Sequence, residues 1–270
     1  MHTPTELDST VYRRFTKKVS FCTPINILVG GLADYLGVFE SLFSQPGDVY
    51  WFRGHASTDW ELCPSALRYS SESLRVRAID SMRDFRRLQE YRLPKSPAPT
   101  ELFKWLQLAQ HYGLPTRLLD WTQSPTVALY FACQNRESDG VVYAMKPRDL
   151  NRLSIPKSGL DVVDPDEHGE ILARYLKLDG KESTRGLKTI AVQPTWNSDR
   201  IILQQGMFTL HGSRFSLDKK QAPSLIGIPI LKQHKKALSH QLERIGVAEM
   251  FIFPEPEHVC NHLKLKIAEP

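Results

Sequence analysis

Residues 111–122 read HYGLPTRLLDWT, and this stretch carries the strongest clues to the fold. It places Gly113 and Pro115 among polar and aromatic side chains. A helix pattern ends just before it, and another begins shortly after it. A segment anchored at both ends holds its side chains in fixed positions, and such segments often carry functional sites. We therefore expect a ligand pocket here.

An internal ion pair is the other interpretation of this stretch. Arg117 and Asp120 are close enough in sequence to pair and so to fix the loop. That pairing accounts for two charges, but it leaves four polar or aromatic residues without a role: His111, Tyr112, Trp121 and Thr122. We favour the ligand pocket for this reason.

A second polar motif lies upstream, at the end of an expected strand. Residues 49–52 (VYWF) are β-branched and aromatic, so they predict a strand that ends at Arg53 and Gly54. Arginine presents a planar fork of donors that suits phosphate or carboxylate, and glycine allows a ligand to approach the backbone. Arg53 could equally bind an internal carboxylate such as Asp120, so both interpretations stay open.

The remaining periodicity predicts helices in the first half of the chain and strands in the second. Helices are expected over residues 25–43, 71–92, 101–112, 126–134, 167–176, 232–244 and 257–266. Strands are expected over residues 141–145, 187–192, 201–210, 224–230 and 247–253. Residues 146–159 are polar and are expected to form a mobile loop. This order predicts an α+β fold in which a helical N-terminal half packs on a mixed, mostly antiparallel β core.

Composition narrows the class of protein. Of the 270 residues, 41% are hydrophobic, which is enough to form a core. No apolar run is long enough to cross a membrane, and no secretion signal is visible. The four cysteines are far apart and match no metal-binding spacing, so we expect reduced thiols, a cytoplasmic location and no metal site. The net charge of +5 permits contact with nucleic acid or with an anionic cofactor.

Several motifs together resemble one family, the FRG domain. Residues 52–54 (FRG), followed by residues 62–68 (LCPSALR), resemble the start of that domain. Residues 111–122 with the downstream segment 124–132 resemble its central signature. Residues 200–208 (RIILQQGMF) and 245–254 resemble its later blocks. The resemblance implies an FRG domain over residues 25–265, preceded by an N-terminal extension of residues 1–24.

The order of these blocks is also similar to the three motifs of ADP-ribosyltransferases, which use NAD. The resemblance implies a β core of the ADP-ribosyltransferase type. It also implies that the first motif contacts the phosphates or ribose of NAD, and that the second shapes the nicotinamide pocket. The binding residues implied in this way are Arg53, Gly54, His111, Tyr112, Arg117, Trp121, Thr122 and Tyr130.

The third motif of such enzymes carries a glutamate, which stabilises the positive charge that builds on the ribose. This chain has Gln204 and Gln205 at that place. A strand lets only one of the two face the pocket, and we expect Gln205, because it directly precedes Gly206. The resemblance thus implies three catalytic residues, Arg53, Asp120 and Gln205. Asp120 or Glu249 could supply the missing carboxylate.

Two functions follow as hypotheses. The first is an NAD-dependent ADP-ribosyltransferase-like effector or toxin of antiviral defence, which cleaves the nicotinamide–ribose bond and modifies an unknown protein or nucleic acid. The second is a non-catalytic module of a bacterial defence or toxin system that binds a nucleotide or a nucleic acid. Trp51, Trp60 and Trp121 would suit single-stranded nucleic acid if exposed, and they suit core packing at least as well.

Overall fold

The computed structural model describes residues 5–42, 47–93, 96–176, 186–195, 198–212 and 216–268. Within these residues, one seven-stranded sheet has the order β1-β7-β4-β2-β3-β6-β5. The strands are β1 (Thr23–Pro24), β2 (Trp51–His55), β3 (Leu118–Thr122), β4 (Gly140–Met145), β5 (Ile190–Val192), β6 (Gly206–Leu210) and β7 (Ile226–Ile230). β1 runs parallel to β7 and the other neighbouring pairs are antiparallel, which confirms the mixed, mostly antiparallel sheet.

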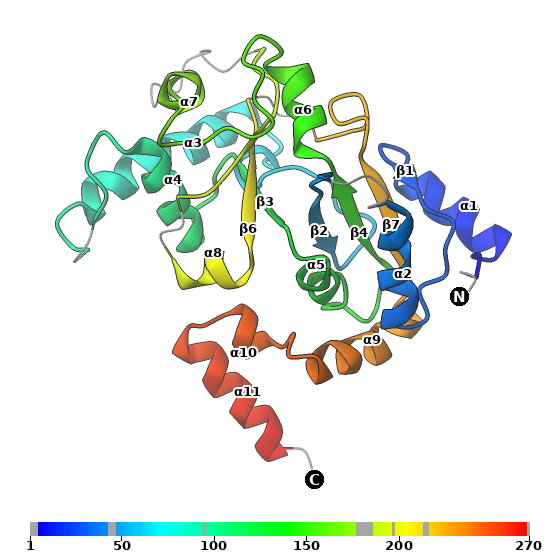
Figure 1. Cartoon of the computed structure of the whole chain (residues 1–270). Coiled ribbons are helices and arrows are strands. Elements are labelled where there is room, and N and C mark those ends of the chain that lie inside the picture. Colours follow the sequence, from blue (N-terminus) through cyan, green and yellow to red (C-terminus); the bar gives the residue numbers. More distant parts are fainter. Residues whose placement is uncertain are drawn as a thin grey trace.

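Helices surround this sheet, so the predicted α+β class is confirmed (Figure 1). The helices are α1 (Ser9–Lys18), α2 (Leu32–Leu42), the short 3-10 helix η1 (Ser65–Leu67), α3 (Glu72–Gln89), α4 (Leu102–His111), α5 (Pro125–Ala132), α6 (Pro147–Ser154), α7 (Gly169–Leu176), α8 (Asp199–Leu203), α9 (Lys232–Arg244), α10 (Glu249–Ile252) and α11 (Pro256–Ala268). α9 has the bounds that the sequence predicted. α5 begins as predicted, because the Ser124 hydroxyl accepts a hydrogen bond from the backbone N–H of Val127.

The expected order of helices first and strands later is wrong. β2 and β3 belong to the first half of the chain and occupy the centre of the sheet. β3 lies inside the stretch 111–122, the second half of which was expected to be a loop. Asp120 is exposed in the middle of this strand, between buried neighbours. The strand is only five residues long and closely follows Gly113 and Pro115, which are turn signals, and this favoured a loop.

Three other segments also differ from expectation. Residues 201–203 belong to helix α8 and not to a strand, because the Ser198 hydroxyl caps this helix by accepting a hydrogen bond from Ile201. The expected strand over residues 247–253 contains helix α10, and the expected mobile loop over residues 146–159 contains helix α6. For α10, a short apolar run did not distinguish one helical turn from a strand. α6 begins with Pro147 at its first turn and buries Leu150.

The sheet buries different residues on its two faces. On one face Trp51, Trp121 and Tyr143 form a core with α1 and α6. The other face carries two separate cores. One packs β2, β4 and β7 against α2, α5 and α9. The other packs β3, β5 and β6 against α3, α4 and α7, and Figure 1 shows these three helices gathered beside β3 and β6. The two cores meet where β2 lies beside β3.

Gly54 allows α5 to pack closely on β2. A Cβ atom at this position would lie 1.9 Å from the carbonyl oxygen of Ala128 and 2.7 Å from the backbone nitrogen of Ala132. The space beside Gly54 is therefore filled by the backbone of α5. The missing side chain therefore makes room for α5, although the sequence predicted that it would make room for a ligand.

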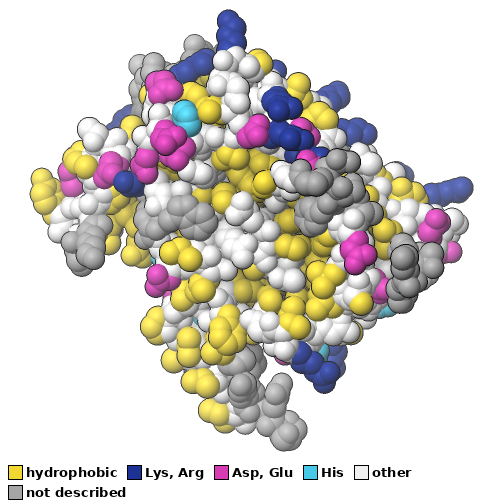
Figure 2. Space-filling view, viewed as in Figure 1, with side chains coloured by type: hydrophobic (Ala, Val, Ile, Leu, Met, Phe, Trp, Pro, Cys, Tyr) yellow, Lys and Arg dark blue, Asp and Glu magenta, His cyan; other side chains and the backbone are white. Residues whose placement is uncertain are grey.

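The C-terminal helices extend away from the sheet (Figure 1). Hydrophobic side chains cover much of the visible surface there (Figure 2). In this segment Phe251, Leu263 and Ile267 are exposed. The segment is joined to the body near α8. The Gln204 side chain donates to the carbonyl oxygen of Ile252 at 3.1 Å, and the Arg200 guanidinium lies 4.6 Å from the ring centre of Phe253.

The composition predicts reduced thiols and no membrane-spanning segment. The four cysteines are free thiols; Cys22, Cys63 and Cys133 are buried and Cys260 is exposed. Of the helices in the described ranges, none has the length and apolar character needed to cross a membrane.

Candidate functional site

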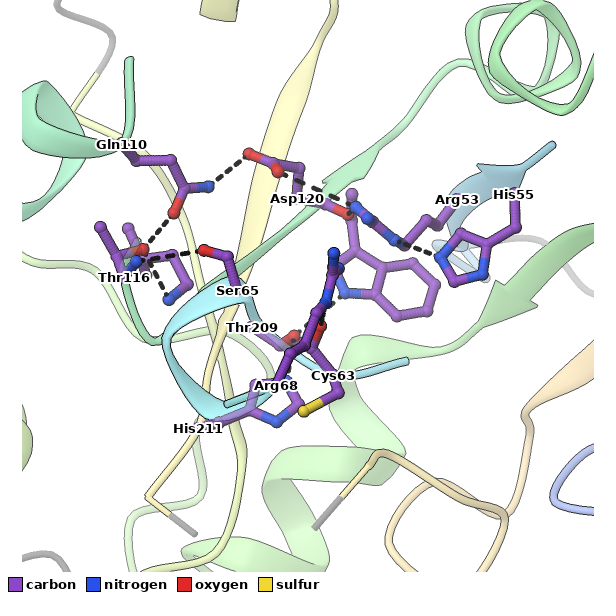
Figure 3. A network of polar contacts seen from close by, with 12 residues as sticks. Arg53, His55, Cys63, Ser65, Arg68, Gln110, Thr116, Asp120, Thr209 and His211 are labelled. Carbon is purple, nitrogen blue, oxygen red and sulfur yellow. Dashed lines mark hydrogen bonds and ion pairs between the residues drawn. The ribbon is translucent and has the colours of Figure 1, made fainter. Parts of the chain in front are cut away.

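The central seam of the sheet, between β2 and β3, has few backbone contacts. Phe52 and Thr122 form its one register pair in the described residues, whereas β2 and β4 share five, as do β3 and β6. The Arg53 side chain bridges the seam instead (Figure 3). Its Nη1 donates to the backbone oxygen of Asp120 at 2.5 Å, and its Nε donates to Nε2 of His55 at 2.9 Å.

A cavity of about 250 Å³ lies at this seam, where the two cores of one sheet face meet. β2 and α5 contribute to one wall, and α4, α8 and β6 to the other. Its aromatic lining includes Phe52, Phe131 and Phe208. The polar residues that line it are Arg53, Gln107, Gln110, His111, Asp120, Thr122, Arg200 and Gln204. Positive, neutral polar and aromatic groups thus share one small space.

The structure brings together six of the ten residues predicted for the site. Those that line the cavity are Arg53, Gly54, His111, Asp120, Trp121 and Thr122. The indole of Trp121 also belongs to the core of the opposite face and donates to Thr209 Oγ1 at 3.1 Å. The Thr122 hydroxyl donates to the backbone oxygen of Gln204 at 2.6 Å, which ties β3 to the end of α8.

Arg117 lies away from this cavity. Its guanidinium donates to the carbonyl oxygens of Tyr175 and His211. Burial lowers the pKa of Arg117 to about 10, so it remains protonated at neutral pH. Tyr175 is in the last turn of α7, where helix carbonyls lack partners within the helix. Arg117 therefore neither pairs with Asp120 nor contributes to the cavity, and both sequence interpretations are wrong for this residue.

Two predicted tyrosines also lie outside the cavity lining. Tyr112 caps the C-terminus of α4 with 61% of its surface exposed. Tyr130 lies on α5, but the residue that reaches the cavity from this turn is Phe131. Neighbouring helix residues point about 100° apart, so the sequence of residues 128–132 (ALYFA) alone could not decide which ring faces the cavity.

Gln205 does not line the cavity, whereas Gln204 does. The expectation that Gln205 faces the pocket is therefore corrected. It assumed a strand, but both glutamines follow α8 in a turn, where alternation does not apply. Gln205 has a positive φ of 46°, and its carbonyl oxygen accepts a hydrogen bond from the backbone N–H of Gln123 at 3.0 Å.

Three polar residues of the cavity were not predicted from the sequence: Gln107, Gln110 and Arg200. The Gln110 side chain donates to Oδ1 of Asp120 at 2.7 Å and accepts from the Thr116 hydroxyl, as Figure 3 shows. A signal was present, because Gln107, Gln110 and His111 have the spacing of three and four that places side chains on one helix face.

The cavity keeps its positive charge at neutral pH. Burial lowers the pKa of Arg53 to about 10, against the opposing effect of the Asp120 carboxylate. The two charged groups are 3.9 Å apart, and the Asp120 side chain is 62% exposed. An ion pair this exposed is weak, so Asp120 can still interact with a ligand. Burial and the charge of Arg200 lower the pKa of His111, which favours its neutral form.

His55 is buried and neutral beside Arg53. The pKa of His55 is held well below its usual value of 6.5, mainly by burial and to a smaller extent by the charge of Arg53. Its Nδ1 lies 3.3 Å from the carbonyl oxygen of Trp60. Nδ1 therefore carries the hydrogen and donates to Trp60, which leaves Nε2 free to accept from Arg53. Neutral His55 thus fixes the orientation of the guanidinium.

This neutral histidine predicts a pH-dependent stability. Below the unfolded-state pKa of about 6.5 the unfolded chain binds a proton at His55 that the folded chain excludes. The contribution of His55 to the free energy of unfolding should therefore be complete above this pH. Below it, protonation of His55 in the unfolded chain should lower the free energy of unfolding by up to about 1.4 kcal/mol per pH unit. Urea unfolding of the wild type and of His55→Gln between about pH 7.5 and pH 5 tests this. The variant should show a smaller slope of the free energy of unfolding against pH than the wild type. Equal slopes in the two proteins would contradict the prediction.

Comparison with known proteins supports a family for part of the chain. No curated protein matches this sequence, and no solved structure does. A family model described as the FRG domain matches residues 48–140. The match runs from just before β2 to the first residue of β4, and it includes Arg53, His111, Asp120 and Thr122. The comparison therefore supports membership of the FRG domain family over residues 48–140.

Proposed function

We propose that the chain binds NAD in the cavity between β2 and β3 and acts as an ADP-ribosyltransferase or NAD glycohydrolase. One observation carries the proposal. Arg53, Asp120 and Thr122 from the two central strands and His111 from α4 line the same cavity. These are residues for which the resemblance to ADP-ribosyltransferases implied a role.

The shape and charge of the cavity suit part of a dinucleotide. Its volume of about 250 Å³ lies just below the range of roughly 300–1,000 Å³ that is usual for ligand sites. It would take one end of NAD and leave the other end at the opening. Arg53 and Arg200 supply positive charge for the diphosphate. The rings of Phe52, Phe131 and Phe208 supply apolar surface for a planar base.

The proposed reaction breaks the bond between the nicotinamide nitrogen and C1′ of the ribose, and the electron pair leaves on nicotinamide. Positive charge builds on the sugar, and a carboxylate stabilises it. Asp120 is the carboxylate that lines the cavity among the described residues. Glu249 does not line it and contacts His258 at 2.8 Å. C1′ then bonds to water or to the acceptor, whose proton passes to solvent.

Replacing Asp120 by asparagine tests this role. Asn keeps an oxygen that can accept from Gln110, so NAD should bind with an affinity close to that of the wild type. Nicotinamide release should fall about 100-fold or more, as expected when a group that stabilises transition-state charge is lost. Binding is measured by calorimetry and nicotinamide by chromatography. Asp84→Asn, on the exposed face of α3, is the control. Unchanged release would show that Asp120 is not the catalytic carboxylate.

A non-catalytic nucleotide-binding module is the second candidate. Gln204 lies in the wall where the resemblance implies a glutamate, and glutamine carries no charge. NAD binding without nicotinamide release by the wild type would support this candidate. Recognition of single-stranded nucleic acid is less favoured, because Trp51 and Trp121 are 1% and 3% exposed and belong to the core. Trp60 is 54% exposed.

A further inference from the structure

We infer that Gln107 forms a subsite of the cavity that binds the carbonyl oxygen of a neutral, planar group. Gln107 lies on α4, lines the cavity and is 3% exposed. Its side-chain nitrogen has no hydrogen-bond partner within the described part of the chain. Gln107 therefore combines an unused, buried donor with a place in the wall of the proposed ligand space.

Thr195 determines which way the Gln107 amide points. The side-chain oxygen of Gln107 lies 2.7 Å from the Thr195 hydroxyl and 3.3 Å from the Thr195 backbone nitrogen. A backbone N–H can only donate, so the atom that faces Thr195 must be the amide oxygen. The NH₂ group then points away from Thr195, and its two hydrogens remain to be paired.

An unused buried donor is rare in folded proteins. Burial without a partner costs free energy, and more than nine in ten buried polar groups have at least one hydrogen bond. Gln107 is held in place by Thr195 and lines a cavity, so a ligand atom is the partner that would satisfy it. That atom must be an acceptor, because the NH₂ group has only hydrogens to offer.

The surroundings of Gln107 favour a neutral acceptor. Gln107 carries no charge, and neither does Phe208, which also lines the cavity and packs against Phe103 with ring centres 6.5 Å apart. A phosphate or carboxylate would lose its water here without gaining an opposite charge from these groups. Arg53 and Arg200 suit anionic groups better. The carbonyl oxygen of an amide, which has no formal charge, fits the Gln107 donor.

This inference rests on the proposed function and makes it more specific. In NAD, the neutral planar group with a carbonyl oxygen near the reacting bond is the carboxamide, which is attached to the cationic pyridinium ring of nicotinamide. Gln107 would therefore distinguish NAD from ADP-ribose, which has the same diphosphate and adenosine but lacks nicotinamide. Gln107 is then a specificity-determining residue, and Thr195 is the positioning residue that orients it.

The test compares binding of NAD and ADP-ribose by calorimetry in the wild type and in two variants. Gln107→Leu keeps a similar volume and removes the donor. It should weaken NAD binding by about 10-fold or more, while ADP-ribose should bind within about twofold of the wild type. Gln233→Leu, on the exposed face of α9, is the matched control and should bind both ligands normally.

A second measurement uses the wild type alone, in case Gln107→Leu does not fold. In ¹⁵N-labelled protein, NAD should shift the side-chain NH₂ resonances of Gln107, and ADP-ribose should not. Equal shifts with both ligands would overturn the carboxamide assignment. An equal loss of affinity for NAD and for ADP-ribose in Gln107→Leu would also overturn it. Normal NAD binding by folded Gln107→Leu would overturn the subsite and leave the proposed function standing. A wild type that binds neither ligand would overturn the proposed function and this assignment together.

Discussion

Arg53→Ala is expected to weaken NAD binding about 100-fold or more and to abolish nicotinamide release. Arg53 lines the cavity, and its side chain is only 18% exposed. Charged hydrogen bonds in such sites contribute about 1.5–3 kcal/mol each, and a diphosphate can accept two from one arginine. Calorimetry with NAD measures the loss, and Arg87→Ala on the exposed surface of α3 is the control.

The same substitution should also lower stability, by about 1–3 kcal/mol, because His55 and the Asp120 carbonyl lose their donor. Arg53→Gln separates the two effects. Its amide can still donate within the seam but carries no charge, so it should fold better than Arg53→Ala and still bind NAD poorly. If Arg53→Gln binds NAD like the wild type, Arg53 is a structural residue that fills the seam.

Gly54→Ala is expected to destabilise the protein by about 3 kcal/mol or more, enough to prevent folding if the protein is only marginally stable. The added methyl group would meet the Ala128 carbonyl oxygen at 1.9 Å. Because this oxygen belongs to the backbone of α5, no side-chain rotation can relieve the contact. Either α5 moves off β2, which opens the core that contains Phe52 and Leu129, or the chain does not fold. Thermal unfolding and the yield of soluble protein measure the effect.

Gly37→Ala is the matched control for this prediction. Gly37 lies inside α2, and a Cβ atom there would meet no other atom within 4 Å. Alanine favours the helix over glycine by about 1 kcal/mol, so this variant should be slightly more stable than the wild type. A Gly54→Ala protein as stable as the wild type would show that α5 does not pack against β2 in this way.

Local signals predicted the elements that depend on local interactions. Ser124 followed by Pro125 marks the start of α5, because a cap and a fixed φ act within one turn. The apolar spacing over residues 232–244 predicts α9 with its observed bounds. Arg53 was predicted as a site residue because its donor fork follows an aromatic strand and precedes a glycine, and Asp120 because it could supply the missing carboxylate. The structure places both at the cavity.

Other features depend on which segments meet in space. Arg117 and Asp120 are three residues apart, yet Arg117 binds the end of α7 and Asp120 lines the cavity. The partner of Gln107 is Thr195, 88 residues away, so no local pattern could reveal that its amide nitrogen is left unused. The sequence alone determined the α+β class, many of the helices and the two polar motifs, because helix caps and periodicity act over a few residues. Only the tertiary structure decided which side chains share the cavity, because that depends on how β2 and β3 separate and on which helices cover the gap.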